Sequence, residues 1–191
     1  VVISYETKVA DYDLGDPDSN GNYAVKNTAG IDGFHSDKTV YYKPVNEKSK
    51  TVLDISQDGS SVTYKWLGEV KQTNGSFRGK TISDIMNATS NDGKSIKSVL
   101  DTDSIIMYVQ RNGTGSYEPL DSSNYTVVPN DDNTSFGIKF NDSEEFDNIN
   151  LVQIQYSSTV DVTGLDEGTI INVNNKATYK GEIFEPSADK T

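Results

Sequence analysis

The stretch Val152-Gln-Ile-Gln-Tyr-Ser-Ser-Thr-Val160 decides the fold class, because Val152, Ile154 and Tyr156 alternate with polar residues. This alternation is typical of a β-strand that buries one face and leaves the other in water. The same period of two recurs along the 191-residue chain, for example in Val62-Thr-Tyr-Lys-Trp66, which follows the turn signal Asp58-Gly59. Helical periodicity is nearly absent, so we expect an all-β protein built as a β-sandwich.

The alternating segments predict the positions of the strands. Two further segments are not expected to be strands. Residues 31–38 have the composition of a linker, and residues 90–103 could hold a short helical turn. The expected strands cover residues 1–10, 22–30, 39–46, 48–54, 61–71, 80–86, 104–111, 124–128, 135–140, 149–160 and 169–180.

The segment Val152–Val160 has an earlier copy in the chain. Val1–Val9 repeats its pattern, and Val25-Lys-Asn-Thr-Ala29 likewise corresponds to Val173-Asn-Asn-Lys-Ala177. Self-similarity at a fixed offset of about 150 residues, the length of one domain, marks an array of like domains. We therefore predict that residues 1–37 are the C-terminal strands of a preceding repeat plus a linker, and that residues 38–191 form one module.

Charge and composition exclude several classes of function. The net charge is −12 and no basic cluster occurs, which disfavours nucleic acids and anionic membrane surfaces as partners. Cysteine is absent, which excludes disulfides, thiolate metal sites and cysteine catalysis. The single histidine, His35, makes a Ser/His/Asp triad implausible, and paired carboxylates such as Asp166 and Glu167 lie in polar loops. We expect no enzyme turnover, no cofactor and no membrane insertion.

One acidic loop resembles part of a calcium site. Asp16, Asp18 and Asn20 match the first half of a calcium-binding loop. The position that a bidentate glutamate takes in such loops is occupied by Asn27. We therefore interpret the loop as a solvated acidic turn and keep it only as a weak metal candidate.

Seven motifs occur in an order that resembles a known family. Over roughly residues 39–180 the chain is similar to the collagen-adhesin-type immunoglobulin-like modules of Gram-positive surface adhesins and pilins. The motifs are Lys43-Pro-Val-Asn-Glu-Lys48, Val62–Trp66, Gly79-Lys-Thr-Ile-Ser-Asp84, Tyr125-Thr-Val127, Phe136-Gly-Ile-Lys-Phe140, Val152–Tyr156 and Asn175-Lys-Ala-Thr178.

The resemblance implies both a fold and a role. The fold would be an immunoglobulin-like β-sandwich. The role would be that of a structural stalk or adhesion module in an extracellular, cell-wall-anchored surface protein. Its partners would be neighbouring repeats of the same chain, and a host matrix protein or glycan.

Modules of this family commonly form an intramolecular isopeptide bond between a first-strand lysine and a last-strand asparagine, promoted by an acidic residue. The resemblance assigns Asn175 as the acceptor and Asp84 as the acid. Lys48 is the favoured nucleophile because it follows a proline by four residues, and Lys43 and Lys50 are the alternatives.

Elementary electrostatics makes this assignment chemically reasonable. Alternation places Asp84 on the same strand face as Ile82, so burial would raise the pKa of the carboxyl group and keep it protonated. The same surroundings would lower the pKa of a lysine and free its amine to attack the Asn175 amide. Such a bond forms once, without cofactor or turnover.

Aromatic residues supply an alternative function. Tyr41, Tyr42, Tyr117 and Trp66 could stack on sugar rings, as in a carbohydrate- or host-matrix-binding module without a crosslink. The alternation of Tyr64 with Trp66 instead favours a place in the core for both.

Overall fold

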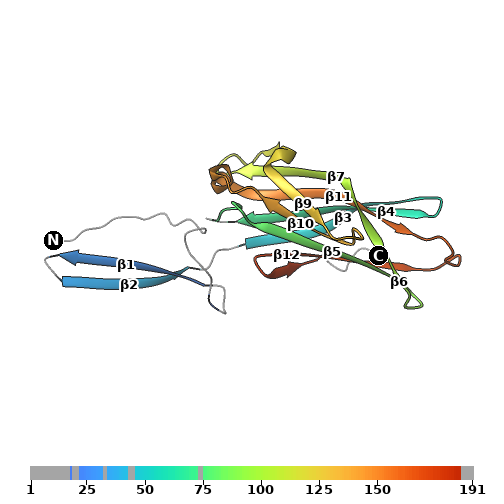
Figure 1. The fold of residues 1–191 in the computed structure, drawn as a ribbon, viewed down its shortest axis with the longest axis horizontal. Helices are drawn as coiled ribbons and strands as arrows, with labels where there is room; N and C mark the ends of the chain where they lie inside the picture. The colour runs from blue at the N-terminus through green and yellow to red at the C-terminus, as the bar shows by residue number, and fades with distance from the viewer. Residues whose placement is uncertain (1–17, 19–21, 32–33, 43–45, 73–74, 186–191) are drawn as a thin grey trace.

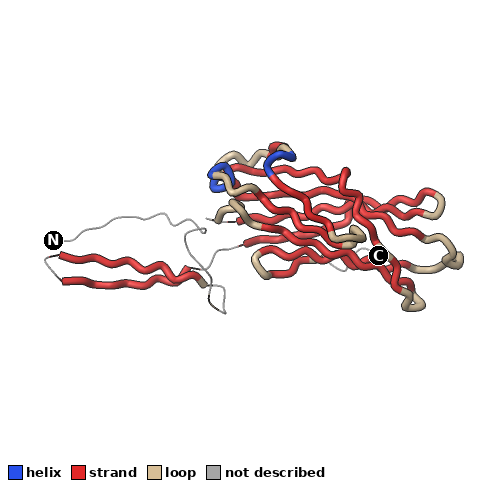
Figure 2. Tube along the Cα trace, in the orientation of Figure 1, coloured by secondary structure: helices blue, strands red, loops and turns tan. Residues whose placement is uncertain are grey.

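The structure of the chain is a computed structural model that describes residue 18 and residues 22–31, 34–42, 46–72 and 75–185. Within these ranges the chain is built of strands with two short 3-10 helices, η2 (Ser122–Asn124) and η3 (Glu144–Asn148), and no helix there is long and apolar enough to cross a membrane (Figure 2). The strands are β1 (Tyr23–Ile31), β2 (Phe34–Tyr42), β3 (Asn46–Asp58), β4 (Ser61–Gln72), β5 (Thr81–Ser90), β6 (Ser95–Ile96), β7 (Ser98–Arg111), β8 (Tyr117–Pro119), β9 (Tyr125–Pro129), β10 (Ser135–Phe140), β11 (Ile149–Asp161), β12 (Ile171–Tyr179) and β13 (Glu182–Phe184).

Two antiparallel sheets form an immunoglobulin-like β-sandwich, as predicted (Figure 1). One sheet has the order β3-β4-β11-β7-β8. The other has the order β13-β12-β5-β10-β9, with β6 paired to β5. The long strand β11 pairs with β4 on one side and with β7 on the other, and so forms the centre of the first sheet.

The alternating residues of both sheets form one core. Strand β5 shows the pattern most clearly, because every second side chain from Ile82 to Ser90 is buried. In β4, Trp66 is 1% exposed, and its indole nitrogen donates a hydrogen bond of 2.9 Å to Ser158 of β11. A buried indole N–H needs such an acceptor, so this pair fixes the orientation of the largest core side chain.

Strands β1 and β2 form a two-stranded sheet of their own, which corrects the predicted linker over residues 31–38. Asp32-Gly33, a dipeptide that favours hairpin turns, stands between the strands in the sequence. Across the pair, Asp37 forms an ion pair of 2.6 Å with Lys26 and accepts a hydrogen bond of 2.7 Å from Thr28. These cross-strand contacts stabilise a strand in a segment that looked polar enough to be a linker.

The hairpin also affects the predicted domain boundary. The boundary between residues 37 and 38 falls inside β2, and the sandwich itself begins at Asn46. The copy at residues 1–9 lies outside the described residues. The assignment of residues 1–37 to a preceding repeat therefore stays a prediction.

Residues 90–103 contain no helical turn. They form a turn, the short strand β6 and the first part of β7, which is longer than the strand predicted over residues 104–111. The pattern was hard to follow here because β7 pairs with β11 through two register shifts, and a bulge breaks strict alternation.

Candidate crosslink site between the two sheets

Four polar side chains meet in the core of the sandwich. Lys50 of β3 and Tyr156 of β11 come from one sheet, and Asp84 of β5 and Asn175 of β12 come from the other. Their exposed fractions are 5%, 3%, 5% and 0%, respectively. Buried polar groups in such number need partners, and they find them in one another.

Strand alternation explains why these side chains point inward. Asp84 lies between the buried Ile82 and Met86 at alternate positions of β5. Asn175 begins the buried series of β12 and pairs in register with Met86, while Asp84 pairs with Ala177. The side chains of Asp84 and Asn175 are thus diagonal neighbours on the inner face of one sheet.

The four side chains form a closed ring of hydrogen bonds. The Lys50 Nζ donates to Asp84 Oδ2 and, at 2.6 Å, to Asn175 Oδ1. The Tyr156 hydroxyl donates to Asp84 Oδ2 at 2.8 Å and accepts from Asn175 Nδ2 at 2.7 Å. Among the described residues, the other carboxyl oxygen of Asp84, Oδ1, has no hydrogen-bond partner. A buried carboxyl with one bare oxygen is easier to accommodate when it carries a proton.

Burial moves the pKa values in the directions that a condensation reaction needs. It lowers the pKa of Lys50 to about 8, against the opposing attraction of Asp84. It raises the pKa of Asp84, although Lys50 and Tyr156 pull that pKa down. For both groups desolvation is the largest effect. A neutral amine beside a neutral acid is therefore more favourable in this site than it would be in water.

One aromatic pair lies at the site. The Tyr156 ring packs edge-on against Phe136, with centroids 5.0 Å apart and planes at 78°, and the Lys50 Nζ lies 5.5 Å from the Tyr156 ring centroid. Phe136 also pairs across the strands with Asp84. The low dielectric of this surrounding strengthens interactions among the four polar groups.

Lys48, the predicted nucleophile, is not at the site. Its Nζ forms an ion pair with Glu182 of β13, whereas Lys50 contacts both Asp84 and Asn175. The two lysines share the inner face of β3, but a spacing of two residues moves an amino group by about 6.5 Å along a strand. Lys43, the other alternative, lies outside the described residues. Lys50 therefore replaces Lys48 as the candidate nucleophile.

Tyr156 is the member of the site to which no role could be assigned from the sequence. A signal was available, because Tyr156 shares the inward face of its strand with Val152 and Ile154. A tyrosine on such a face looks like an ordinary core residue. The contact of its hydroxyl with Asp84 and Asn175 depends on which strands face each other across the sandwich.

The acidic loop shows no metal site in its described part. Asp16 and Asn20 lie outside the described residues, and the carboxylate of Asp18 accepts hydrogen bonds from the backbone and side-chain amides of Asn22. In the part of the chain that the structure describes, no three histidine or acidic side chains cluster as metal ligands would.

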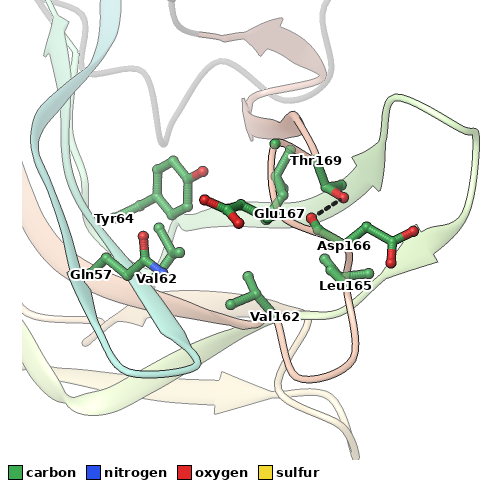
Figure 3. Close-up of a pocket in the computed structure, with 10 residues that line it drawn as sticks. Gln57, Val62, Tyr64, Val162, Leu165, Asp166, Glu167 and Thr169 are labelled. Carbon is green, nitrogen blue, oxygen red and sulfur yellow. Dashed lines mark hydrogen bonds between the residues drawn. The ribbon is translucent and has the colours of Figure 1, made fainter.

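A cavity of about 420 Å³ lies apart from the crosslink site (Figure 3). It is lined by the ends of β3, β4 and β12 and by the loop that carries Asp166 and Glu167. Figure 3 shows Glu167 pointing toward Tyr64, whereas the Asp166 carboxylate points away. The two carboxylates do not converge on one point, as a hydrolytic pair would.

No protein-family model matches this sequence. No curated protein matches it either. Among solved structures, the chain is similar to the collagen-binding domain of a Staphylococcus aureus adhesin, with 14% identity, a TM-score of 0.40, and coverage of 72% of this chain and 93% of that one. The collagen-binding subdomain of the Enterococcus faecalis surface protein ACE matches with 14% identity, a TM-score of 0.41, and coverage of 73% and 95%.

The RrgB pilus protein of Streptococcus pneumoniae matches with 12% identity and a TM-score of 0.46. That match covers 85% of this chain but only 29% of the pilus protein. Adhesins and pilins are the classes that the sequence resemblance named. At 12–14% identity and TM-scores of 0.40–0.46, these likenesses assign no function to this chain.

Proposed function

We propose that this chain is a structural stalk or adhesion module of a bacterial cell-surface protein, stabilised by an isopeptide bond between Lys50 and Asn175. The observation that supports the bond is the buried Lys50 Nζ, which contacts the Asn175 carbonyl oxygen at 2.6 Å and the Asp84 carboxyl group. Burying a lysine, an acid and an amide in one core is costly for stability. Formation of a covalent bond would explain why these residues are buried together, whereas packing alone does not require them.

The reaction is a condensation. The neutral Lys50 amine attacks the Cγ of Asn175, which lies one C=O bond of about 1.2 Å beyond the oxygen that Nζ already contacts. The Nζ–Cγ bond forms, the Cγ–Nδ2 bond breaks, and ammonia leaves. Asp84 takes the proton that Lys50 gives up and so keeps the amine nucleophilic.

The bond would have a mechanical effect because of where it lies. It would join β3, the first strand of the sandwich, to β12, close to its end, and it would link the two sheets. The residues it joins are 125 positions apart. In the chain-entropy treatment of disulfides, closing such a loop constrains the unfolded state by about 5 kcal/mol. A surface stalk under tension would benefit from both effects.

The alternative, a sugar- or matrix-binding module without a crosslink, has less support. Trp66 is buried, and Tyr64 stacks on it with ring centroids 5.7 Å apart, so neither ring is free to bind a sugar. Tyr41 and Tyr117 are exposed but lie on different sheets, on β2 and β8. Two separate rings do not form a stacking platform.

Intact mass tests the crosslink directly. The folded protein should weigh about 17 Da less than its sequence mass, because one ammonia is lost. Lys50→Ala, Asp84→Ala and Asn175→Ala should each restore the full mass. Lys48→Ala is the matched control and should keep the deficit, since Lys48 pairs with Glu182 instead. Full mass in the folded wild-type chain would rule the bond out, and a deficit that survives Lys50→Ala would exclude Lys50 as the nucleophile.

A further inference from the structure

The hydroxyl of Tyr156 occupies a particular position in the ring of hydrogen bonds. It contacts Asp84 Oδ2 on one side and Asn175 Nδ2, the nitrogen that must leave, on the other. We propose that Tyr156 is a catalytic residue of the crosslinking reaction, and that its hydroxyl transfers a proton from Asp84 to the departing nitrogen of Asn175. This inference rests on the proposed Lys50–Asn175 bond.

The need for such a donor follows from the chemistry of amides. An amide nitrogen leaves as ammonia only after it gains a proton, because the amide anion is far too basic to leave. Asp84 is hydrogen-bonded to Lys50 and to Tyr156, while Nδ2 of Asn175 is bonded to Tyr156. Within the described part of the chain, the hydrogen-bonded route from the acid to the leaving nitrogen therefore passes through the tyrosine.

The proton count closes along this route. Lys50 first gives a proton to Asp84, which leaves a neutral amine beside a neutral acid. The amine attacks Cγ of Asn175, the carbonyl electrons move to Oδ1, and Nδ2 loses its conjugation and becomes basic. The two hydrogen bonds of the tyrosine then reverse, so that the protonated Asp84 donates to the phenol oxygen and the phenol O–H donates to the basic Nδ2. Tyr156 protonates Nδ2, Asp84 passes its proton to Tyr156, and the new Nζ–Cγ link gives its extra proton to Asp84. The oxyanion collapses, ammonia leaves, and Asp84 ends as the neutral acid.

The tyrosine also sets the orientation of the amide. Because Nδ2 donates to the Tyr156 oxygen, Oδ1 is directed at Lys50, and the amine meets the carbonyl side of the group. If the amide were reversed, its NH₂ group would face the Lys50 amino group, which is also a donor. The carbonyl oxygen would then no longer be polarised by Lys50, and attack on the carbonyl carbon would be less favourable. One hydroxyl thus both positions the acceptor and supplies the proton.

Two further features suit this role. The ring is held by its edge-on contact with Phe136, so the hydroxyl has a fixed place. Burial raises the pKa of Tyr156 well above its ordinary value, so the phenol keeps its proton throughout the pH range in which Lys50 loses one. The phenol therefore both starts and ends the reaction in its protonated form.

The test compares crosslinking rates in the full 191-residue chain. Each variant is made by cell-free synthesis, quenched unfolded in urea, refolded by dilution, and followed by the fraction with the mass deficit. Tyr156→Phe keeps the ring but removes the hydroxyl, and it should crosslink roughly 100-fold more slowly, the scale of a lost general acid. Tyr64→Phe, at another buried tyrosine whose hydroxyl is not part of the ring of hydrogen bonds, is the matched control and should react at the wild-type rate.

The outcomes separate this inference from the proposed function. A wild-type chain that never loses mass would contradict the crosslink itself. A wild-type chain that crosslinks while Tyr156→Phe does so equally fast would overturn the role of Tyr156 alone. Circular dichroism shows whether the slow variant is folded.

A second substitution covers the case in which Tyr156→Phe does not fold. A ring-fluorinated tyrosine at position 156 keeps the shape and the hydroxyl of the side chain but makes the hydroxyl more acidic. A proton-transferring tyrosine should then show an altered rate and an altered pH profile. An unchanged rate and profile would mean that the hydroxyl only positions the amide, and the proton-transfer proposal would fail.

Discussion

Lys48 and Lys50 of β3 both point into the sandwich, and the partners of their amino groups distinguish them. Lys48 pairs with Glu182, whose side chain is 61% exposed at the edge of the other sheet. Lys50 pairs with a carboxyl group that is itself buried, and with a buried amide. Only the second arrangement removes both charged groups from water, and this desolvation is what lowers the pKa of an amine and raises that of an acid.

The shared proton predicts a bell-shaped pH dependence of crosslinking. The reactive state holds one proton between Lys50 and Asp84. At low pH both groups are protonated, so the rate should rise with pH as the pair passes the raised pKa of Asp84. Above the Lys50 pKa of about 8 the pair loses its last proton, so the rate should fall again.

Refolding of urea-quenched chain at a series of pH values, followed by intact mass, measures this profile. Tyr64→Phe should give the same curve and serves as the control. A rate that keeps rising above the Lys50 pKa would show that the amine alone limits the reaction and that Asp84 need not carry a proton.

The sequence was informative about some residues of the site and not about others. Asp84 and Asn175 were assigned through the family resemblance, and strand alternation placed Asp84 on the same face as Ile82. The choice among Lys43, Lys48 and Lys50 was open, since period-two alternation places Lys48 and Lys50 on the same face. Their difference depends on the facing sheet, and pairing across a sandwich is not a local property of the sequence.

At the scale of elements, the strands β4, β7 and β11 are connected by a small polar network inside the core. Ser158 of β11 is fully buried and accepts hydrogen bonds from the Trp66 indole at 2.9 Å and from the Ser98 hydroxyl at 3.0 Å. Because its hydroxyl accepts both of these hydrogen bonds, a serine can be buried among apolar residues on the inward face of the strand.

We expect Ser158→Ala to destabilise the protein by about 1–3 kcal/mol, because it leaves the buried donor of Trp66 without an acceptor. The free energy of unfolding in urea measures the effect, in a Lys50→Ala background that cannot crosslink. Ser157→Ala, on the opposite face of the same strand, is the control and should change stability by less than about 0.5 kcal/mol. Equal effects of the two substitutions would show that the hydrogen bond contributes nothing specific.

Strand positions were predictable where alternation was regular. The predicted segments 61–71, 135–140 and 149–160 differ from β4, β10 and β11 by one residue at most. The miss at β2 had a different cause. β2 is a strand because it pairs with β1 along its length, and this pairing, like the contact of Asp37 with Lys26, becomes visible only once the two strands lie together.

At the scale of the whole molecule, the hairpin and the sandwich form separate sheets (Figure 1). Both large sheets are built from residue 46 onward, and among the side chains that the structure describes the buried hydrophobic cluster contains none from β1 or β2. The described core residues of the sandwich therefore all come from one continuous part of the chain, as in a domain that folds by itself.

Deleting residues 1–42 should accordingly leave a cooperatively folding domain that still loses about 17 Da and whose melting temperature changes by only a few degrees. Calorimetry and intact mass measure the two properties. Deletion of residues 1–37 is an informative comparison, because it cuts β2 and leaves its remainder without β1. Loss of folding in the longer deletion would make the hairpin an integral part of the sandwich.

The proposed crosslink gives the sharpest prediction for the whole molecule, because it would limit how much of the chain can be stretched. When the protein is pulled at its two ends, the force would pass through the proposed Lys50–Asn175 bond, and the 125-residue interval between the two residues would be bypassed. Extended, that interval would add about 410–450 Å. Single-molecule force spectroscopy should therefore find no such extension in the wild-type chain and a gain of about this length in Lys50→Ala. Lys48→Ala should behave as the wild type does. A full-length extension in the wild-type chain would mean that the lysine and asparagine remain unlinked and that the stalk resists force by packing alone.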